Sequence, residues 1–245
     1  RHCTAGSVTA GNLTMMKNTV DPLATQSGVL AALLAEKGYT GPEHVLDGKE
    51  GFSHVFDTEW KFDILTEGLG ESWRILQCGM KFFPTEALTH APISAVLDLV
   101  ISNDLAHDEV KDVTIYSLAR AADILADPSK YDPRTKETAD HSLPYVIAAA
   151  VAERQVTPVQ FTDAKIMDPT IRAQLNKVQV IADPEIEAVF PELQRVRVVI
   201  TTTDGRRFEK QLDYPKGDPR NPLTDDEISG KFAALAQGVA TPEDV

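Results

Sequence analysis

Three residues combine a reactive side chain with unusually apolar surroundings: Lys17, Lys81 and His90. Lys17 follows the run LTMM, Lys81 lies within CGMKFFP, and His90 lies in the uncharged stretch THAPISAV. Burying an unpaired ammonium is costly, so a buried lysine either loses its proton and acts as a base or stays charged against a bound anion. A histidine nearby can move protons near neutral pH. The three residues therefore predict a cationic pocket for an anion.

The same residues also have a purely structural interpretation. A lysine in an apolar run commonly packs its alkyl stem and keeps its ammonium in water. A single histidine is often a core or capping residue. The spacing of Lys17, Lys81 and His90 leaves both interpretations open.

Composition restricts the class of partner. The chain has 245 residues, of which 42% are hydrophobic and 25% charged, and its net charge is −13. Such an acidic balance argues against nucleic acid and anionic membrane surfaces as partners. The apolar runs are shorter than the ~20 residues that a membrane-spanning helix needs. An anionic substrate would therefore require a local cationic pocket on an acidic protein.

Familiar cofactor and catalytic motifs are missing. The two cysteines, Cys3 and Cys78, cannot form a disulfide framework, a zinc site or an iron–sulfur site by themselves, and the six histidines show no HxxxH or HxH spacing. P-loop, GxGxxG, GxSxG and HExxH motifs are also absent from the sequence. The sequence therefore offers no metal or cofactor motif. The few cysteines favour a reducing compartment.

Start and stop signals predict several helices. Asp21-Pro22 begins one that runs to Gly38, where glycine is a common stop. A capping box of Thr224 and Glu227 begins another that ends near Gly238. Further helices are predicted over residues 91–102, over 138–152 and after Asp168-Pro169.

Strands are fewer. Residues 195–214 predict an antiparallel hairpin with its turn at Asp204-Gly205. Residues 110–116 and 178–181 are further predicted strands, and 73–78 is a weaker one. Helices and strands do not alternate as in βαβ units, so the predicted fold class is α+β.

The ends of the sequence indicate a piece of a longer protein. The chain begins without Met, and Thr241-Pro242 followed by two acidic residues has the pattern of a helix start only a few residues before the last residue.

Four long segments resemble the MmgE/PrpD family, in the order in which that family carries them. They are LTMMKNTVDPLATQSGVLAALLAEKGYTGP (13–42), the run from MKFFP to the following histidine (80–90), YDPRTKETADHSLPYV (131–146) and YPKGDPRNPLTDDEISGKF (214–232). The resemblance implies a mainly helical domain and a smaller α+β lid domain with the active site between them. Residues 1–83 and 222–245 would belong to the helical domain and 84–221 to the lid.

The resemblance also assigns residues. Lys17 matches the family's active-site lysine in the helical domain, and Lys81 matches the lysine just before the lid. His90 matches, approximately, the histidine beyond the proline. His141 is interpreted as a helix-start residue rather than a catalyst. The family's lid tyrosine has no match, and the pattern departs near residues 116–122.

The family is best known for 2-methylcitrate dehydratase, so we expect a cofactor-independent lyase that dehydrates 2-methylcitrate to 2-methyl-cis-aconitate in propionate catabolism. Lys17 and Lys81 would hold the carboxylates, and His90 or a histidine outside this chain would carry the proton. The alternatives are cis-aconitate decarboxylase, a dicarboxylate epimerase, and a non-catalytic folded fragment. Family members imply a homodimer in the cytoplasm or mitochondrial matrix. About the first half of the family chain is missing here, so this chain alone should be inactive.

Overall fold

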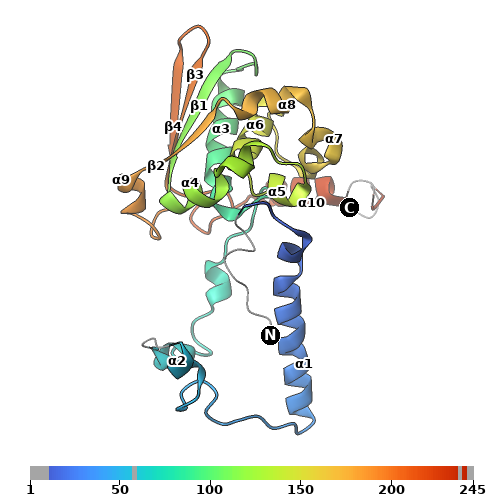
Figure 1. The fold of residues 1–245 in the computed structure, drawn as a ribbon, viewed down its shortest axis with the longest axis vertical. Helices are drawn as coiled ribbons and strands as arrows, with labels where there is room; N and C mark the ends of the chain where they lie inside the picture. Colours follow the sequence, from blue (N-terminus) through green and yellow to red (C-terminus); the bar gives the residue numbers. More distant parts are fainter. Residues whose placement is uncertain (1–10, 57–59, 237–238, 242–245) are drawn as a thin grey trace. The chain divides into compact units, whose positions relative to one another are not determined.

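The computed structural model describes residues 11–56, 60–236 and 239–241. Contacts between Cα atoms divide these residues into two units (Figure 1). Residues 18–77 form the smaller unit, and residues 11–17 together with those from 78 onward form the larger one. Lys17, Lys81 and His90 therefore all lie in the larger unit. The domain bounds inferred from the family resemblance remain a prediction.

The smaller unit is built around the long helix α1 (Val20–Glu36). The predicted stop is confirmed: the helix ends just before Gly38, whose φ of +86° favours glycine. Short helical turns follow at α2 (Phe52–Val55), η3 (Phe62–Leu65) and η4 (Arg74–Gln77). The predicted strand at 73–78 is therefore wrong. A strand needs a hydrogen-bonded neighbour, and these residues pair with none of the four described strands.

The larger unit contains a four-stranded sheet in the order β2-β1-β3-β4. Its strands are β1 (Val110–Ser117), β2 (Val178–Ala182), β3 (Val196–Thr202) and β4 (Arg207–Leu212). β1 is parallel to β2 and antiparallel to β3, and β3 and β4 form the predicted hairpin. Gly205 in the hairpin turn has a φ of +89°, as a tight turn requires. The α+β class is confirmed.

Two buried helices pack beside this sheet (Figure 1). α3 (His90–Ser102) contacts β3 and β4, while α6 (Leu143–Glu153) contacts α3, β2 and α8 (Pro169–Leu175). Their apolar side chains form most of the core between helices and sheet, with Ile93, Val96, Val100, Ile147 and Ala150 fully enclosed. The remaining helical segments are α4 (Ala119–Leu125), α5 (Lys136–Ala139), α7 (Asp163–Ile166), α9 (Pro184–Glu187), η2 (Met15–Asn18), η5 (Ala87–Thr89), η6 (Pro128–Tyr131) and η7 (Pro158–Phe161).

The predicted helix at 138–152 is in fact two helices. α5 ends at Ala139, and α6 begins at Leu143 because the hydroxyl of Ser142 accepts a hydrogen bond from Tyr145 N at 3.0 Å. The three residues between the helices, 140–142, form a turn and belong to neither helix. This turn becomes important for the site.

The capping box at the start of α10 (Asp225–Ala236) is confirmed. Thr224 N donates to Glu227 Oε2 at 2.8 Å, and Glu227 N donates to Thr224 Oγ1 at 3.2 Å. The predicted end of this helix near Gly238, and the helix predicted from Thr241-Pro242, extend into residues outside the described ranges. Across the described residues, none of the helices is both long enough and apolar enough to span a membrane.

Candidate active site

Lys17 is held on the larger unit by the short segment that precedes it. Leu13 N donates to Thr138 Oγ1 at 3.3 Å, and the Leu13 side chain is buried. Lys130, whose side chain is fully buried, donates a hydrogen bond to the carbonyl of Gly11. These contacts fix the backbone on either side of Asn12. Lys17 therefore reaches the turn after α5 from an anchored segment.

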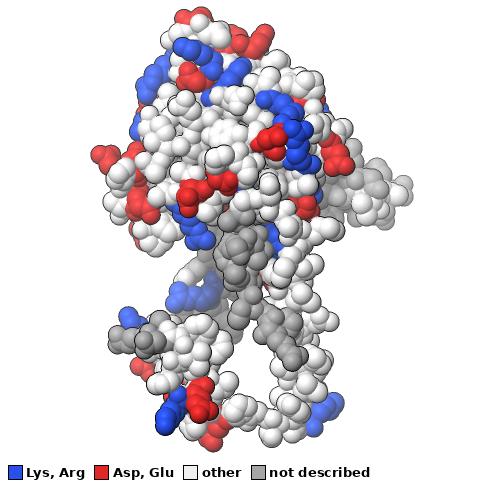
Figure 2. Space-filling model, in the orientation of Figure 1, with Lys and Arg blue, Asp and Glu red and all other residues white. Residues whose placement is uncertain are grey.

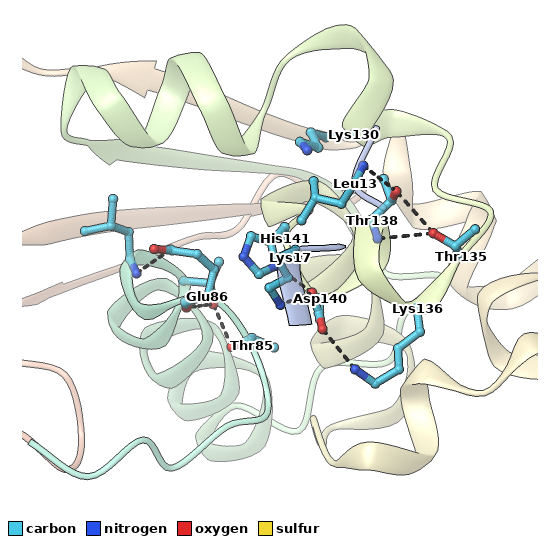
Figure 3. A network of polar contacts seen from close by, with 12 residues as sticks. Leu13, Lys17, Thr85, Glu86, Lys130, Thr135, Lys136, Thr138, Asp140 and His141 are labelled. Atoms are coloured by element: carbon cyan, nitrogen blue, oxygen red, sulfur yellow. Dashed lines mark hydrogen bonds and ion pairs between the residues drawn. The ribbon is translucent and has the colours of Figure 1, made fainter. Parts of the chain in front are cut away.

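Asp140 is the centre of a network of polar side chains (Figure 3). Its Oδ1 lies 3.5 Å from Lys17 Nζ and 2.5 Å from His141 Nδ1, and its Oδ2 lies 3.1 Å from Lys136 Nζ. The Asp140 side chain is only 6% exposed. Burial alone would raise the pKa of Asp140, but the hydrogen bond from His141 and the charge of Lys17 outweigh it and lower this pKa. Asp140 is thus a carboxylate that its neighbours keep ionised.

Two successive helix starts create this arrangement. The hydroxyl of Thr135 caps α5, accepting from Thr138 N at 3.3 Å, and Ser142 caps α6. Lys136 and Asp140 are four residues apart, which places them on one side of α5. His141, just before the cap of α6, then turns its ring onto Asp140.

Lys81 is connected to the same turn through one peptide group. Lys81 Nζ donates to the carbonyl of Thr85 at 2.8 Å, and the amide N–H of Glu86 in that peptide donates to the carbonyl of Asp140 at 3.0 Å. The O and N of a peptide group are separated by ~2.3 Å, so Lys81 Nζ lies at most about 8 Å from the Asp140 carbonyl oxygen. The lysine predicted before the lid is therefore adjacent to the network around Lys17.

The ammonium of Lys81 is available to an anion. Lys81 is exposed, and among the residues that the structure describes no carboxylate lies within ion-pair distance of its Nζ. Its backbone is fixed instead: Lys231 of α10 donates a hydrogen bond to the Lys81 carbonyl. The backbone is thus held, and among the described residues the one hydrogen bond of the ammonium is to a peptide carbonyl.

His90 lies behind this lysine. It is the first residue of α3, is 3% exposed, and packs edge-on against Phe83 with ring centroids 5.5 Å apart. Its pKa is lowered to about 4, first by burial and then by the charge of Lys81, although a hydrogen bond to the Thr85 backbone acts in the opposite direction. His90 is therefore neutral at neutral pH. Its Nε2 is buried without a partner among the described residues.

The ion pairs of the network differ from those of the rest of the larger unit. Most arginines of the larger unit are matched by carboxylates, such as Arg134 with Asp132 at 2.8 Å, and Figure 2 shows several places where the two signs lie side by side. In the network, by contrast, Asp140 pairs with both Lys17 and Lys136. The carboxylate of Glu86 caps η5 by accepting from Leu88 N at 2.6 Å. Two ammonium groups thus meet at one carboxylate, which leaves Lys17 able to bind a second carboxylate.

A cavity of about 340 Å³ lies elsewhere in the larger unit, next to α10. Its walls are mostly apolar, and they include Phe82, Phe83, Leu97, Val156 and Leu235. An apolar cavity of this kind does not suit a ligand with several carboxylates. In the described residues, no group of three or more His, Cys, Asp or Glu side chains is arranged to hold a metal ion.

Sequence reasoning found part of this site. Lys17 and Lys81 come from the sequence and are linked through the turn at Asp140, whereas Asp140 and Lys136 were missed. The four-residue spacing of Lys136 and Asp140 was the one available signal. His141 does precede a helix start, as interpreted, but its side chain also binds Asp140. The roles of Lys17, Lys81 and His90 remain predictions.

Comparisons with known proteins agree with the segment resemblances. Residues 83–245 match the MmgE/PrpD C-terminal domain, and residues 2–65 match the MmgE/PrpD N-terminal domain. Cis-aconitate decarboxylase of Homo sapiens is 28% identical over 238 residues, covering 95% of this chain and 48% of the human protein. The cis-aconitate decarboxylase-like protein oryM of Aspergillus oryzae is 26% identical over 242 residues, covering 94% of this chain and 50% of that protein.

A third relative, cis-aconitate decarboxylase of Aspergillus terreus, is 23% identical over 239 residues, covering 92% of this chain and 49% of its own length. The chain thus spans about half the length of the curated relatives it matches. Since the two domain matches together cover most of the sequence, the chain belongs to the MmgE/PrpD family.

Proposed function

We propose that the full-length protein containing this chain is a lyase that acts on a small tricarboxylate. The observation that carries the proposal is that hydrogen bonds of the Thr85–Glu86 peptide connect Lys81 to Asp140, whose carboxylate binds Lys17. Two ammonium groups on fixed segments suit a ligand with more than one carboxylate. Several lysines gathered around one carboxylate, in a protein of net charge −13, point to the same class of ligand.

The cations would also serve the chemistry. Removing a proton or CO2 next to a carboxylate leaves an electron pair that spreads into that carboxylate as an aci-carboxylate dianion. Preorganised positive charge stabilises such a developing charge. Lys17 and Lys81 would therefore hold the substrate and lower the barrier by binding the intermediate more strongly than the substrate.

For His90 the proposal is narrower. Its burial and its neutral ring suit a supporting role, in which it holds the Thr85 backbone that also binds Lys81 Nζ. Direct proton transfer by His90, as the family resemblance suggests, would require residues 84–90 to move and expose the ring.

Two reactions fit this site. Similarity to three proteins named as cis-aconitate decarboxylases or decarboxylase-like favours decarboxylation of cis-aconitate, in which a C–CO2 bond breaks and the carbon takes up a proton. The resemblance of residues 131–146 to the MmgE/PrpD family supports dehydration of 2-methylcitrate, in which a C–H and a C–O bond break. In both reactions, negative charge develops on the carbon next to a carboxylate.

Incubating the full-length protein with each acid distinguishes them. Release of CO2 from cis-aconitate would identify a decarboxylase, and a rise in alkene absorbance from 2-methylcitrate without CO2 would identify a dehydratase. A change in optical rotation of a dicarboxylate, with neither signal, would identify an epimerase. Inactivity toward all of these acids would overturn the proposal. This chain assayed alone should be inactive, and activity there would contradict the expected need for further residues.

Two substitutions test the residues. Lys17→Ala and Lys81→Ala should each lower kcat/KM by about 100-fold, the typical effect of removing a group that binds developing charge. Lys210→Ala is the matched control, because Lys210 pairs with Asp98 at 2.7 Å and takes no part in the network, so its kcat/KM should stay near that of wild type. Rates within a few-fold of wild type for both Lys17→Ala and Lys81→Ala would contradict the assignment.

The proposal includes a homodimer, which light scattering on the full-length protein can measure. It also includes a location in the cytoplasm, or in the mitochondrial matrix of a eukaryote, which fractionation can test.

A further inference from the structure

His141 and Asp140 form a histidine–carboxylate pair, and His141 has no role in the chemistry proposed above. His141 Nδ1 lies 2.5 Å from Asp140 Oδ1, and the two side chains are 7% and 6% exposed. A carboxylate kept ionised by its neighbours accepts hydrogen bonds only. The neutral ring must therefore carry its proton on Nδ1 and donate it to Asp140.

The second ring nitrogen is then left with a lone pair. Within the part of the chain that the structure describes, His141 Nε2 makes no hydrogen bond, since the ring's one polar contact is through Nδ1. A histidine whose Nδ1 is fixed by a carboxylate and whose Nε2 is free has the geometry of a general base, or of a general acid once protonated.

The charged groups around the ring come from several segments. Lys17 of η2 reaches the same Asp140 oxygen as His141, at 3.5 Å. Lys136 of α5 binds the other oxygen, and Lys130 of η6 interacts with Asp140 electrostatically. On the side of the loop at 85–90, the Glu86 amide holds the Asp140 carbonyl. Figure 3 shows Lys17 and His141 converging on Asp140.

We propose that His141 is a catalytic residue whose Nε2 transfers the proton at the substrate carbon, with Asp140 as the positioning residue that fixes its tautomer. This inference rests on the proposed lyase function. It assigns the proton transfer to His141 instead of His90. His141 shares Asp140 with Lys17, the ammonium that would bind the reacting carboxylate.

The steps balance for either reaction. In decarboxylation, the C–CO2 bond breaks, CO2 leaves, and the electron pair stays on the substrate carbon. Protonated His141 gives its Nε2 proton to that carbon and regains one from water. In dehydration, neutral Nε2 takes the proton of the C–H bond, the electron pair forms the alkene, and the departing hydroxide combines with that proton to give water.

His141→Asn is the sharpest variant, because an asparagine amide can occupy the place of Nδ1 and still donate to Asp140, while nothing replaces Nε2. In the full-length protein we expect kcat to fall by about 100-fold or more while KM stays within about threefold. The limb of the pH–kcat profile that reports His141 should also disappear. A kcat within threefold of wild type, with an unchanged profile, would overturn the proposal.

His44→Asn is the matched control. His44 also contacts an aspartate through Nδ1, at 3.2 Å from Asp47 Oδ1, but the pair is 69% and 59% exposed and lies in the smaller unit. This variant should keep the wild-type kcat and pH profile.

Nitrogen NMR of the imidazole rings in the wild-type full-length protein supplies a readout that does not depend on turnover or on a variant's folding. The neutral His141 ring should be protonated on Nδ1. Protonation on Nε2 would overturn the proposal even in an active enzyme. Inactivity of the wild-type protein toward every acid would instead overturn the proposed function, whatever the tautomer.

Discussion

His90 and His141 lie in the same unit and are both nearly buried, yet their surroundings differ in sign. His141 faces a carboxylate, whereas His90 faces the charges of Lys81 and Lys231 and packs against Phe83. Burial and positive neighbours lower the pKa of His90 to about 4, so its ring stays neutral. His141 binds a carboxylate through Nδ1, and its Nε2 makes no hydrogen bond to the residues that the structure describes. Although the two histidines are similarly exposed, the surroundings of His90 suit a structural role and those of His141 suit proton transfer.

The difference teaches that the partner of a histidine matters more than its sequence neighbourhood. The sequence indicates His90 as a candidate because its stretch carries no charge, and it indicates only a helix-start role for His141. In the folded unit, the uncharged stretch is core, and the turn before α6 brings His141 to Asp140, which also binds two lysines.

The largest effect on stability should come from Asp140→Ala. This change leaves Lys17 and His141 without their carboxylate, and removing one partner of a largely buried ion pair costs about 3 kcal/mol. Native-state hydrogen exchange of the α6 amides measures the loss. An unchanged exchange rate would show that the network does not stabilise the turn before α6.

Asp140→Asn keeps the shape and removes the charge. Because the pKa of Asp140 is lowered from its ordinary value of 3.8, its ionisation contributes stability above pH ~4 that is lost as the pH falls further. The variant should be less stable than wild type at pH 7, and the gap should narrow below pH ~4. A constant gap at all pH values would contradict this linkage.

The next effect concerns His90 and a different pH window. The pKa of His90 is about 4 in the folded unit, against an ordinary value of 6.5 that applies to the unfolded chain. As the pH falls from 6.5 toward 4, the unfolded chain therefore binds a proton that the folded unit does not, and the free energy of unfolding decreases. Between pH 7.5 and 5 the loss should be about 2 kcal/mol. Denaturant unfolding of wild type and His90→Gln at both pH values measures it, since glutamine does not titrate.

His90→Gln should therefore show a decline between pH 7.5 and 5 that is smaller by that amount. Equal declines in the two proteins would mean that His90 is protonated in the folded state, which would remove the contrast with His141.

The smallest effect should come from the exposed pair of His44 and Asp47. At 3.2 Å it resembles the pair of His141 and Asp140 in geometry, but exposed ion pairs contribute little. His44→Ala should change the free energy of unfolding by less than about 0.5 kcal/mol. A loss as large as that of Asp140→Ala would show that burial is not what separates the two pairs.

The sequence alone predicted those elements whose start, stop or turn depends on residues close together in the chain. The stop of α1 at Gly38, the capping box of Thr224 and Glu227, and the turn at Gly205 each depend on residues close together in the chain. The weak strand at 73–78 failed because pairing depends on a neighbour that the segment does not have.

The network at Asp140 could not be predicted in the same way. Its contacts to Lys17 and, through Thr138, to Leu13 join residues 123 and 125 positions apart. Such pairs form only when the segment at 11–17 docks on the folded larger unit, and no local pattern encodes that docking. The family resemblance supplied Lys17 and Lys81, while Asp140 needed the coordinates.

The most direct test of the site is a crystal structure of the full-length protein with a slowly reacting tricarboxylate such as citrate. We expect its carboxylates within hydrogen-bond distance of Lys17 Nζ and Lys81 Nζ, with a substrate carbon facing His141 Nε2. A tricarboxylate bound away from both lysines would contradict the account.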